Sequence, residues 1–147
     1  HPDWHLDIYG EGPHHDKLQE QIDLLRLNDH ITLCGRSNSI MYVYPEYSLH
    51  IMSSRYEGQP MTLIEAQACG LASVVFDFKF GASDIVRNGH NGIIVPQGDS
   101  KAFCEALCSM MNSEDKRKEY GHNALEMGKQ YFKNNVFSKW IEFINNL

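Results

Sequence analysis

Residues 53–70 read SSRYEGQPMTLIEAQACG, and this stretch decides the local fold. The run before it, SLHIMSS at 48–54, is short, apolar and partly β-branched, which predicts a buried strand. Pro60 suits the first turn of a helix because its ring fixes φ and it has no N–H to leave unpaired. Helical spacing over 61–69, with a stop at Gly70, completes a predicted strand, loop and helix.

Two glutamates flank the predicted start of this helix. Glu57 falls on the loop, and Glu65, eight positions later, falls about one turn into the helix. Helical side chains lean toward the N-terminus, so Glu65 is expected to point back toward Glu57. The free N–H groups near Met61, Thr62 and Leu63 are expected to open onto the same place as an anion site. The two carboxylates could accept hydrogen bonds from sugar hydroxyls, and the backbone N–H groups beside them could bind phosphate. Together they predict a pocket for a sugar nucleotide.

Strand and helix patterns alternate on both sides of this stretch. An apolar stripe among charges predicts an amphipathic helix over 14–27, and Gly10 and Gly12 allow a tight turn just before it. A short helix is expected over 39–47, and SVVFDF at 73–78 predicts another buried strand. This alternation is typical of parallel βαβ units. The expected fold class is therefore α/β, a Rossmann-like open parallel sheet with helices on both faces.

The pattern E-G-x-P, followed by E-A-x-A-C-G, resembles the E-x7-E signature of retaining glycosyltransferases of family 4. The resemblance covers nearly the whole chain and implies the C-terminal half of the two-domain GT-B fold. It also implies strands ending in glycine turns at WHLDIYGEGP, residues 4–13, and at ITLCGR, residues 31–36. It implies that Glu57 is the catalytic residue, contacting hydroxyls of the transferred sugar, and that Glu65 holds the ribose hydroxyls of the nucleotide. The other residues that we expect to bind the donor nucleotide are Gly58, Gln59, Pro60, Met61, Thr62, Leu63, Gly10, Gly12 and Arg36.

The implied activity is retaining transfer of a sugar from a nucleoside diphosphate sugar to an acceptor hydroxyl, in polysaccharide or glycoconjugate synthesis. A UDP-sugar is the favoured donor, and the resemblance implies no cofactor and no metal. We expect residues 1–147 to be a single nucleotide-sugar-binding domain, truncated at its N-terminus relative to the full enzyme. The acceptor domain and a basic Arg–Lys pair for the diphosphate would then lie upstream. Without them the chain alone is expected to transfer no sugar.

Three other functions are open. A sugar-nucleotide epimerase can share the same half-fold, although as a rule it lacks the E-G-x-P context. A dinucleotide-binding oxidoreductase would need G-x-G-x-x-G opening a helix, and GEGPHH at 10–15 fails at the third glycine. A non-catalytic nucleotide-binding or assembly module is the main alternative outside enzymes. One position departs from the resemblance, because Ala72 stands where the family usually has proline.

Composition and charge argue against nucleic acid as a partner and against a membrane-spanning segment. The 147 residues are 42% hydrophobic and 22% charged, which is ordinary for one globular domain. The net charge of −6 and the lack of a basic run argue against nucleic acid. No apolar stretch approaches the roughly 20 residues that cross a bilayer. The expected location is cytoplasmic, and any membrane association would come through the missing domain.

The remaining signals are structural. Four dispersed cysteines fit neither a zinc site nor a disulfide framework, and we expect buried free thiols, in keeping with a reducing compartment. These residues are Cys34, Cys69, Cys104 and Cys108. An apolar stripe over 102–111 predicts core, and the amphipathic segment 136–144 is expected to expose part of its apolar face.

Overall fold

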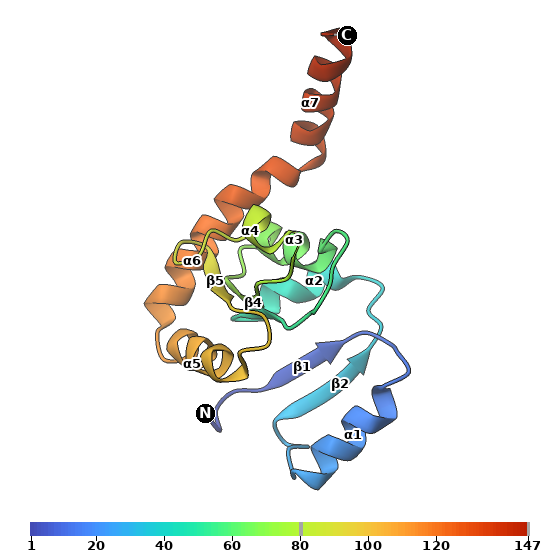
Figure 1. The fold of residues 1–147 in the computed structure, drawn as a ribbon, viewed down its shortest axis with the longest axis vertical. Coiled ribbons are helices and arrows are strands. Elements are labelled where there is room, and N and C mark those ends of the chain that lie inside the picture. Colours follow the sequence, from blue (N-terminus) through green and yellow to red (C-terminus); the bar gives the residue numbers. More distant parts are fainter. Residues whose placement is uncertain (80, 147) are drawn as a thin grey trace. The chain divides into compact units, whose positions relative to one another are not determined.

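The computed structural model describes residues 1–79 and 81–146. The chain forms two compact units, His1–Ile40 and Met41–Leu147, called here the N-terminal and the C-terminal unit. Each unit has its own parallel sheet and its own helices (Figure 1). The interpretation of residues 1–147 as a single domain stays a prediction.

The N-terminal unit is a two-stranded parallel sheet with one helix. Strands β1 (Leu6–Tyr9) and β2 (Ile31–Gly35) pair directly, and α1 (His15–Leu24) connects them. The predicted strands and helix are confirmed. The helix is shorter than expected because Arg26 takes a left-handed conformation at φ 55°, which leaves Leu25 exposed beyond the helix end.

The C-terminal unit contains a three-stranded parallel sheet in the order β3-β4-β5. The strands are β3 (His50–Met52), β4 (Ser73–Phe76) and β5 (Gly92–Val95). The helices are α2 (Ile40–Val43), η1 (Tyr44–Glu46), α3 (Met61–Ala68), α4 (Ala82–Ile85), α5 (Ser100–Met111), α6 (Glu114–Gly128), η2 (Lys129–Tyr131) and α7 (Lys133–Asn145). The central strand β4 reads SVVF and is buried throughout, as expected for a parallel strand covered on both faces. The described strands therefore pair as two sheets, whereas the sequence predicted one.

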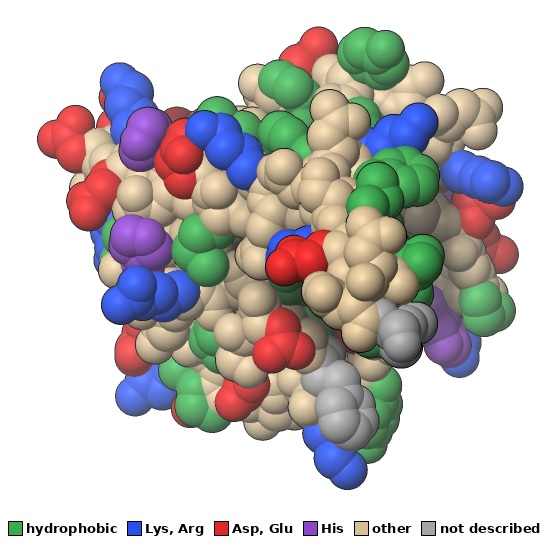
Figure 2. All heavy atoms as spheres, turned by 90° about the horizontal axis from the view of Figure 1, so that it is seen from above, with side chains coloured by type: hydrophobic (Ala, Val, Ile, Leu, Met, Phe, Trp, Pro, Cys, Tyr) green, Lys and Arg blue, Asp and Glu red, His purple; other side chains and the backbone are tan. Residues whose placement is uncertain are grey.

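The apolar face of α7 is exposed, as predicted. None of the described residues of this helix is buried, and Phe137, Trp140 and Ile144 are each more than half exposed. Figure 2 looks down on the C-terminal end of the chain and shows hydrophobic side chains at the surface among acidic and basic ones. Across residues 1–79 and 81–146, no helix combines the length and the apolar character needed to span a membrane.

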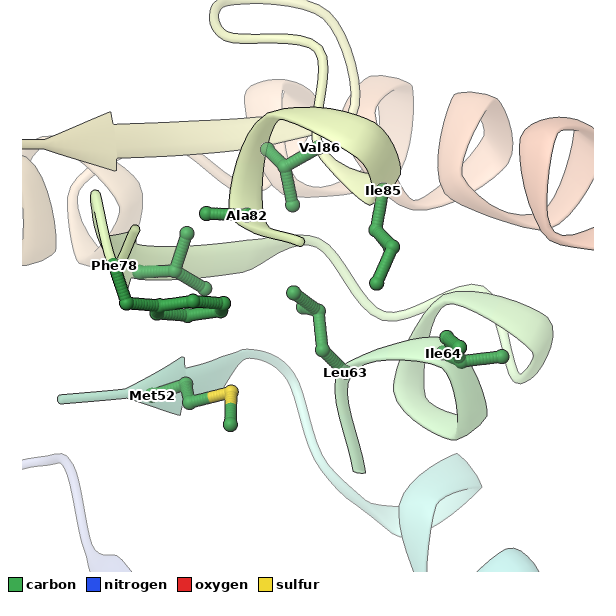
Figure 3. Close-up of a cluster of buried hydrophobic side chains, with 8 residues drawn as sticks. Met52, Leu63, Ile64, Phe78, Ala82, Ile85 and Val86 are labelled. Atoms are coloured by element: carbon green, nitrogen blue, oxygen red, sulfur yellow. The ribbon is translucent and has the colours of Figure 1, made fainter. Parts of the chain in front are cut away.

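Helix α3 is anchored to the sheet by its apolar side. Leu63, which is fully buried, and Ile64 pack in a cluster with Met52 of β3 and with Phe78, beyond β4 (Figure 3). This cluster fixes the rotation of α3 about its own axis. Glu65 consequently lies at the half-buried edge of the helix.

A second cluster occupies the opposite face of β4, because alternate strand residues point to opposite sides. Val74 and Phe76 pack there with Phe103 and Met110 of α5 and with Tyr120 of α6. The prediction that the stripe over 102–111 is core is confirmed.

Two glycines bring α6 close to α3. A Cβ atom at Gly121 would collide with the carbonyl oxygen of Gly70, which is the residue that stops α3. A Cβ at Gly128 would lie 3.0 Å from Cα of Ala68. The backbones of the two helices therefore approach more closely than any larger residue would allow.

The four cysteines are free, but the prediction that all are buried was wrong. Cys34 and Cys69 are half-buried, whereas Cys104 and Cys108 are exposed. The latter two lie four residues apart on the solvent side of α5, beside the buried stripe.

Candidate functional site

The loop from β3 to α3 carries the first predicted site residue. Glu57 is half-buried on this loop, whereas Gly58 and Gln59 are exposed and Pro60 is buried. A Cβ atom added at Gly58 would meet nothing within 4 Å. The loop is thus held at Pro60 and open to solvent on the side of Gly58.

The first turn of α3 is partly closed by its own hydrogen bonds. The Met61 N–H donates to the Gln59 carbonyl at 2.8 Å, and the Leu63 N–H donates to the Pro60 carbonyl at 3.1 Å. The prediction that all three N–H groups are free was therefore wrong. Short-range bonds tighten the start of this helix, a common way to satisfy helix termini. Among the described residues, the Thr62 N–H alone of the three makes no hydrogen bond.

The Glu65 carboxylate raises the pKa values of two protic side chains that the sequence did not indicate as site residues. The Tyr44 hydroxyl donates to the Thr62 carbonyl at 3.1 Å, and burial together with the Glu65 carboxylate raises the pKa of Tyr44 to about 12. The Cys69 thiol makes a weak contact of 3.7 Å with the Met41 carbonyl, and burial followed by Glu65 raises its pKa. Both groups therefore remain protonated beside the carboxylate at neutral pH.

Behind the site, a buried polar network joins α3 to the sheet. Nε2 of Gln67 donates to Oγ of Ser73 at 3.1 Å, and Nδ2 of Asn91 donates to Oε1 of Gln67 at 2.6 Å. Oδ1 of Asn91 accepts from the Arg87 N–H at 2.7 Å, and the His50 ring lies 3.2 Å from Oγ of Ser73. Burial lowers the pKa of His50 to about 4, so the ring is neutral. A polar residue at the apolar spacing of α3, Gln67, was the sequence signal for this network.

The loop after β4 closes against the start of α3. Gly81 has φ 99°, a left-handed conformation that side chains rarely adopt, and a Cβ there would lie 3.0 Å from Cδ of Pro60. This contact fixes the end of the loop that carries Glu57.

The glycine-rich loop of the N-terminal unit is formed as predicted. Gly10 has φ 140°, and its N–H donates to the Gly35 carbonyl at 2.7 Å. A pocket of about 200 Å³ surrounds this loop and includes Gly12 in its lining. Arg36 is exposed just after β2. The assignment of Gly10, Gly12 and Arg36 to donor binding stays a prediction.

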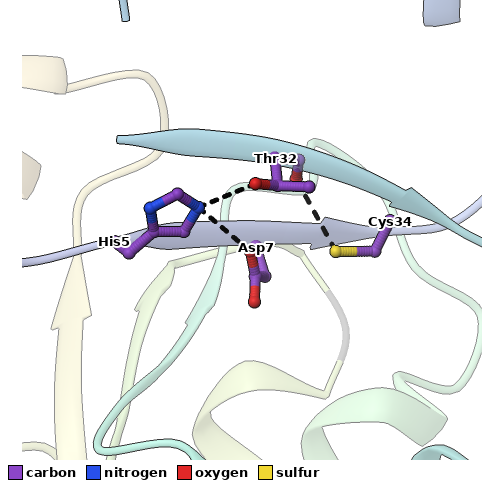
Figure 4. Close-up of polar contacts among 4 residues, drawn as sticks. All are labelled: His5, Asp7, Thr32 and Cys34. Atoms are coloured by element: carbon purple, nitrogen blue, oxygen red, sulfur yellow. Dashed lines mark hydrogen bonds and ion pairs between the residues drawn. The ribbon is translucent and has the colours of Figure 1, made fainter. Parts of the chain in front are cut away.

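One face of the β1–β2 sheet carries a polar cluster (Figure 4). Nε2 of His5 lies 2.8 Å from Oγ1 of Thr32 and 3.3 Å from a carboxylate oxygen of Asp7. Burial, followed by the Asp7 carboxylate, raises the pKa of Cys34. The Cys34 thiol is therefore protonated at neutral pH. Within residues 1–79 and 81–146, no group of three or more His, Cys, Asp or Glu is placed to hold a metal ion.

Comparison with solved structures defines the class of fold. The chain resembles a mutant of Staphylococcus aureus TarM, crystallised with fondaparinux, alpha-GlcNAc-glycerol and UDP, with a TM-score of 0.87 and 27% identity. The match covers 96% of this chain and 29% of that one. The Rossmann-like α/β fold predicted from the sequence is thereby confirmed.

Comparison with known sequences gives the family. The family model described as glycosyl transferases group 1 matches residues 1–127, and the chain belongs to this family. An exopolysaccharide phosphotransferase of Streptomyces coelicolor is 32% identical over 100% of this chain and 16% of its own length. The GtfA subunit of a UDP-N-acetylglucosamine–peptide N-acetylglucosaminyltransferase of Streptococcus agalactiae is 31% identical, over 99% of this chain and 30% of that protein. The chain therefore spans less than a third of either relative.

Proposed function

We propose that this chain is the donor-binding half of a retaining glycosyltransferase that transfers a sugar from a nucleoside diphosphate sugar to an acceptor hydroxyl. The products would be polysaccharides or glycoconjugates. The observation that carries the proposal is the placement of two half-buried carboxylates, Glu57 and Glu65, on either side of the start of α3. Family membership supports it.

Glu65 is the proposed ribose ligand. Its carboxylate makes no hydrogen bond within the described part of the chain, so both oxygens are available to the two ribose hydroxyls. The unbonded Thr62 N–H and the positive end of the α3 dipole lie at the same turn and would favour the diphosphate. As the leaving group departs, these groups would stabilise the charge that develops on it.

Glu57 is the proposed ligand of the transferred sugar. Its loop position would let the carboxylate accept from sugar hydroxyls and orient the anomeric carbon toward the acceptor. Gly58 next to it leaves open space that a side chain would fill. A donor sugar lying along this loop would use that space.

A UDP-sugar is the favoured donor. The S. aureus TarM structure contains UDP, and the S. agalactiae relative is named for UDP-N-acetylglucosamine. Acceptor binding is assigned to a further domain of the parent protein, since the chain spans 30% of that relative.

The proposal is tested in two stages. Calorimetry on the chain should detect binding of UDP-N-acetylglucosamine, competed by UDP and not by free N-acetylglucosamine. The full-length protein should then release UDP in the presence of acceptor, and NMR should find the anomeric configuration of the donor retained. Nucleotide binding without transfer would instead favour the non-catalytic module, and the absence of nucleotide binding would contradict the donor role.

A further inference from the structure

The two protic side chains whose pKa values the Glu65 carboxylate raises both donate to backbone carbonyls and not to that carboxylate. A tyrosine hydroxyl has one proton, and that of Tyr44 is donated to the Thr62 carbonyl at 3.1 Å. The Cys69 thiol is a weaker donor, and it contacts the Met41 carbonyl at 3.7 Å. Toward Glu65, Tyr44 can therefore present only oxygen lone pairs.

As a result, neither side chain donates a hydrogen bond to the Glu65 carboxylate. Within the described residues, its carboxylate receives no hydrogen bond, although it lies close enough to Tyr44 to raise the pKa of that hydroxyl. A half-buried carboxylate loses solvation and gains most from ligands that bring their own donors. Ribose hydroxyls are such ligands.

The Tyr44 ring is itself fixed in place. It is 7% exposed and meets the His50 ring edge-on, with 6.1 Å between ring centroids. The hydroxyl of Tyr44 thus holds the first turn of α3 at Thr62, while its ring contacts His50 at the start of β3. Thr62 and Glu65 are three residues apart and share one side of the helix, so a constraint on one restrains the other.

We propose that Tyr44 is a positioning residue for the donor site, holding the first turn of α3 so that both oxygens of Glu65 face the ribose. The inference rests on the proposed function and adds to it a residue that would touch no donor atom. Tyr44→Phe keeps the ring and removes only the hydroxyl. Tyr42→Phe is the matched control, because Tyr42 lies on the neighbouring α2 and is 83% exposed.

The test is the ratio of affinities for UDP and 2′,3′-dideoxy-UDP, measured by calorimetry on the full chain. A purely structural role would lower thermal stability without changing this ratio. We expect Tyr44→Phe to lower this affinity ratio three- to tenfold and Tyr42→Phe to leave it unchanged. Glu65→Gln should remove most of the preference for UDP over the dideoxy analogue. The double variant should match Glu65→Gln alone within twofold, because Tyr44 acts through Glu65.

The outcomes separate the two claims. If Tyr44→Phe keeps the wild-type ratio, or if its effect multiplies with that of Glu65→Gln, the role of Tyr44 is overturned and the proposed function stands. If the wild-type chain binds both nucleotides equally, the ribose role of Glu65 fails, and the role of Tyr44 fails with it.

Discussion

Asn91 donates a hydrogen bond from Nδ2 to Oε1 of Gln67 at 2.6 Å and so joins the segment before β5 to the last turn of α3. Both side chains are buried, and no buried polar side-chain atom within the described residues lacks a partner. The helix that carries Glu65 is therefore fixed to the sheet by polar as well as apolar contacts.

Asn91→Ala should destabilise the fold. It would leave Oε1 of Gln67 and the Arg87 N–H without their partners, and an unsatisfied buried group costs about 1–3 kcal/mol. We expect the free energy of unfolding in urea to fall by at least about 2 kcal/mol. Asn112→Ala, at an exposed position, is the control and should change it by less than about 0.5 kcal/mol. Equal stability of the two variants would contradict the account of the network.

Gly121→Ala should destabilise the chain despite favouring a helix. Alanine gains about 1 kcal/mol over glycine in a helix interior, but its Cβ would collide with the Gly70 carbonyl oxygen. Overpacking of this kind costs about 1–3 kcal/mol. In thermal unfolding, Gly121→Ala should show a lower melting temperature than the wild type. Gly58→Ala, where open space surrounds the added Cβ, should have the wild-type melting temperature. A more stable Gly121→Ala variant would refute the close approach of α3 and α6.

His50 should make stability depend on pH. Its folded pKa of about 4 lies below the ordinary value of 6.5, so below pH 6.5 the unfolded chain binds a proton that the folded chain does not. Stability is therefore unaffected by His50 above pH 6.5 and falls as pH drops toward 4, by about 1 kcal/mol per unit. Urea unfolding of wild type and His50→Gln from pH 7.5 to 5 isolates this contribution. A difference between the two that stays constant with pH would show that His50 titrates normally.

The parts of the fold that could be predicted depend on local signals. Apolar spacing, Pro60 and Gly70 are enough to place β3, the loop and α3, because each acts on the backbone at its own position. The positions of Glu57 on the loop and Glu65 in the helix follow from them.

The parts that could not be predicted depend on partners distant in sequence. Tyr44 meets Thr62 across 18 residues and Gln67 meets Asn91 across 24, and no periodicity links such pairs. The hydrogen bonds of Met61 and Leu63 depend on the detailed turn at Pro60, which the proline alone does not specify. The sequence therefore indicated where the carboxylates lie, and the structure adds what holds them.

Glu57→Gln should lower turnover of the full-length protein at least tenfold while changing nucleotide affinity less than about twofold. The amide keeps the shape of the side chain but weakens the charge-assisted bonds to the sugar. Steady-state kinetics with a UDP-sugar, together with calorimetry using UDP, separates the two effects. Glu46→Gln, an exposed glutamate on η1, should behave as wild type. Wild-type turnover in Glu57→Gln would exclude Glu57 as a ligand of the donor sugar.

Glu65→Ala addresses the central claim, that this chain binds a nucleoside diphosphate sugar through the helix α3. Charge-assisted hydrogen bonds contribute about 1.5–3 kcal/mol each, so loss of the carboxylate should weaken UDP binding about tenfold or more. Glu119→Ala, at an exposed position of α6, is the control for charge and should bind UDP as wild type does.

The most direct measurement is calorimetric titration of UDP and 2′,3′-dideoxy-UDP into wild type and Glu65→Ala, with circular dichroism to verify folding. We expect Glu65→Ala to lose at least tenfold in affinity for UDP, whereas the dideoxy analogue should bind both proteins about equally poorly. A folded Glu65→Ala variant that binds UDP as tightly as wild type would contradict the ribose assignment and, with it, the donor site.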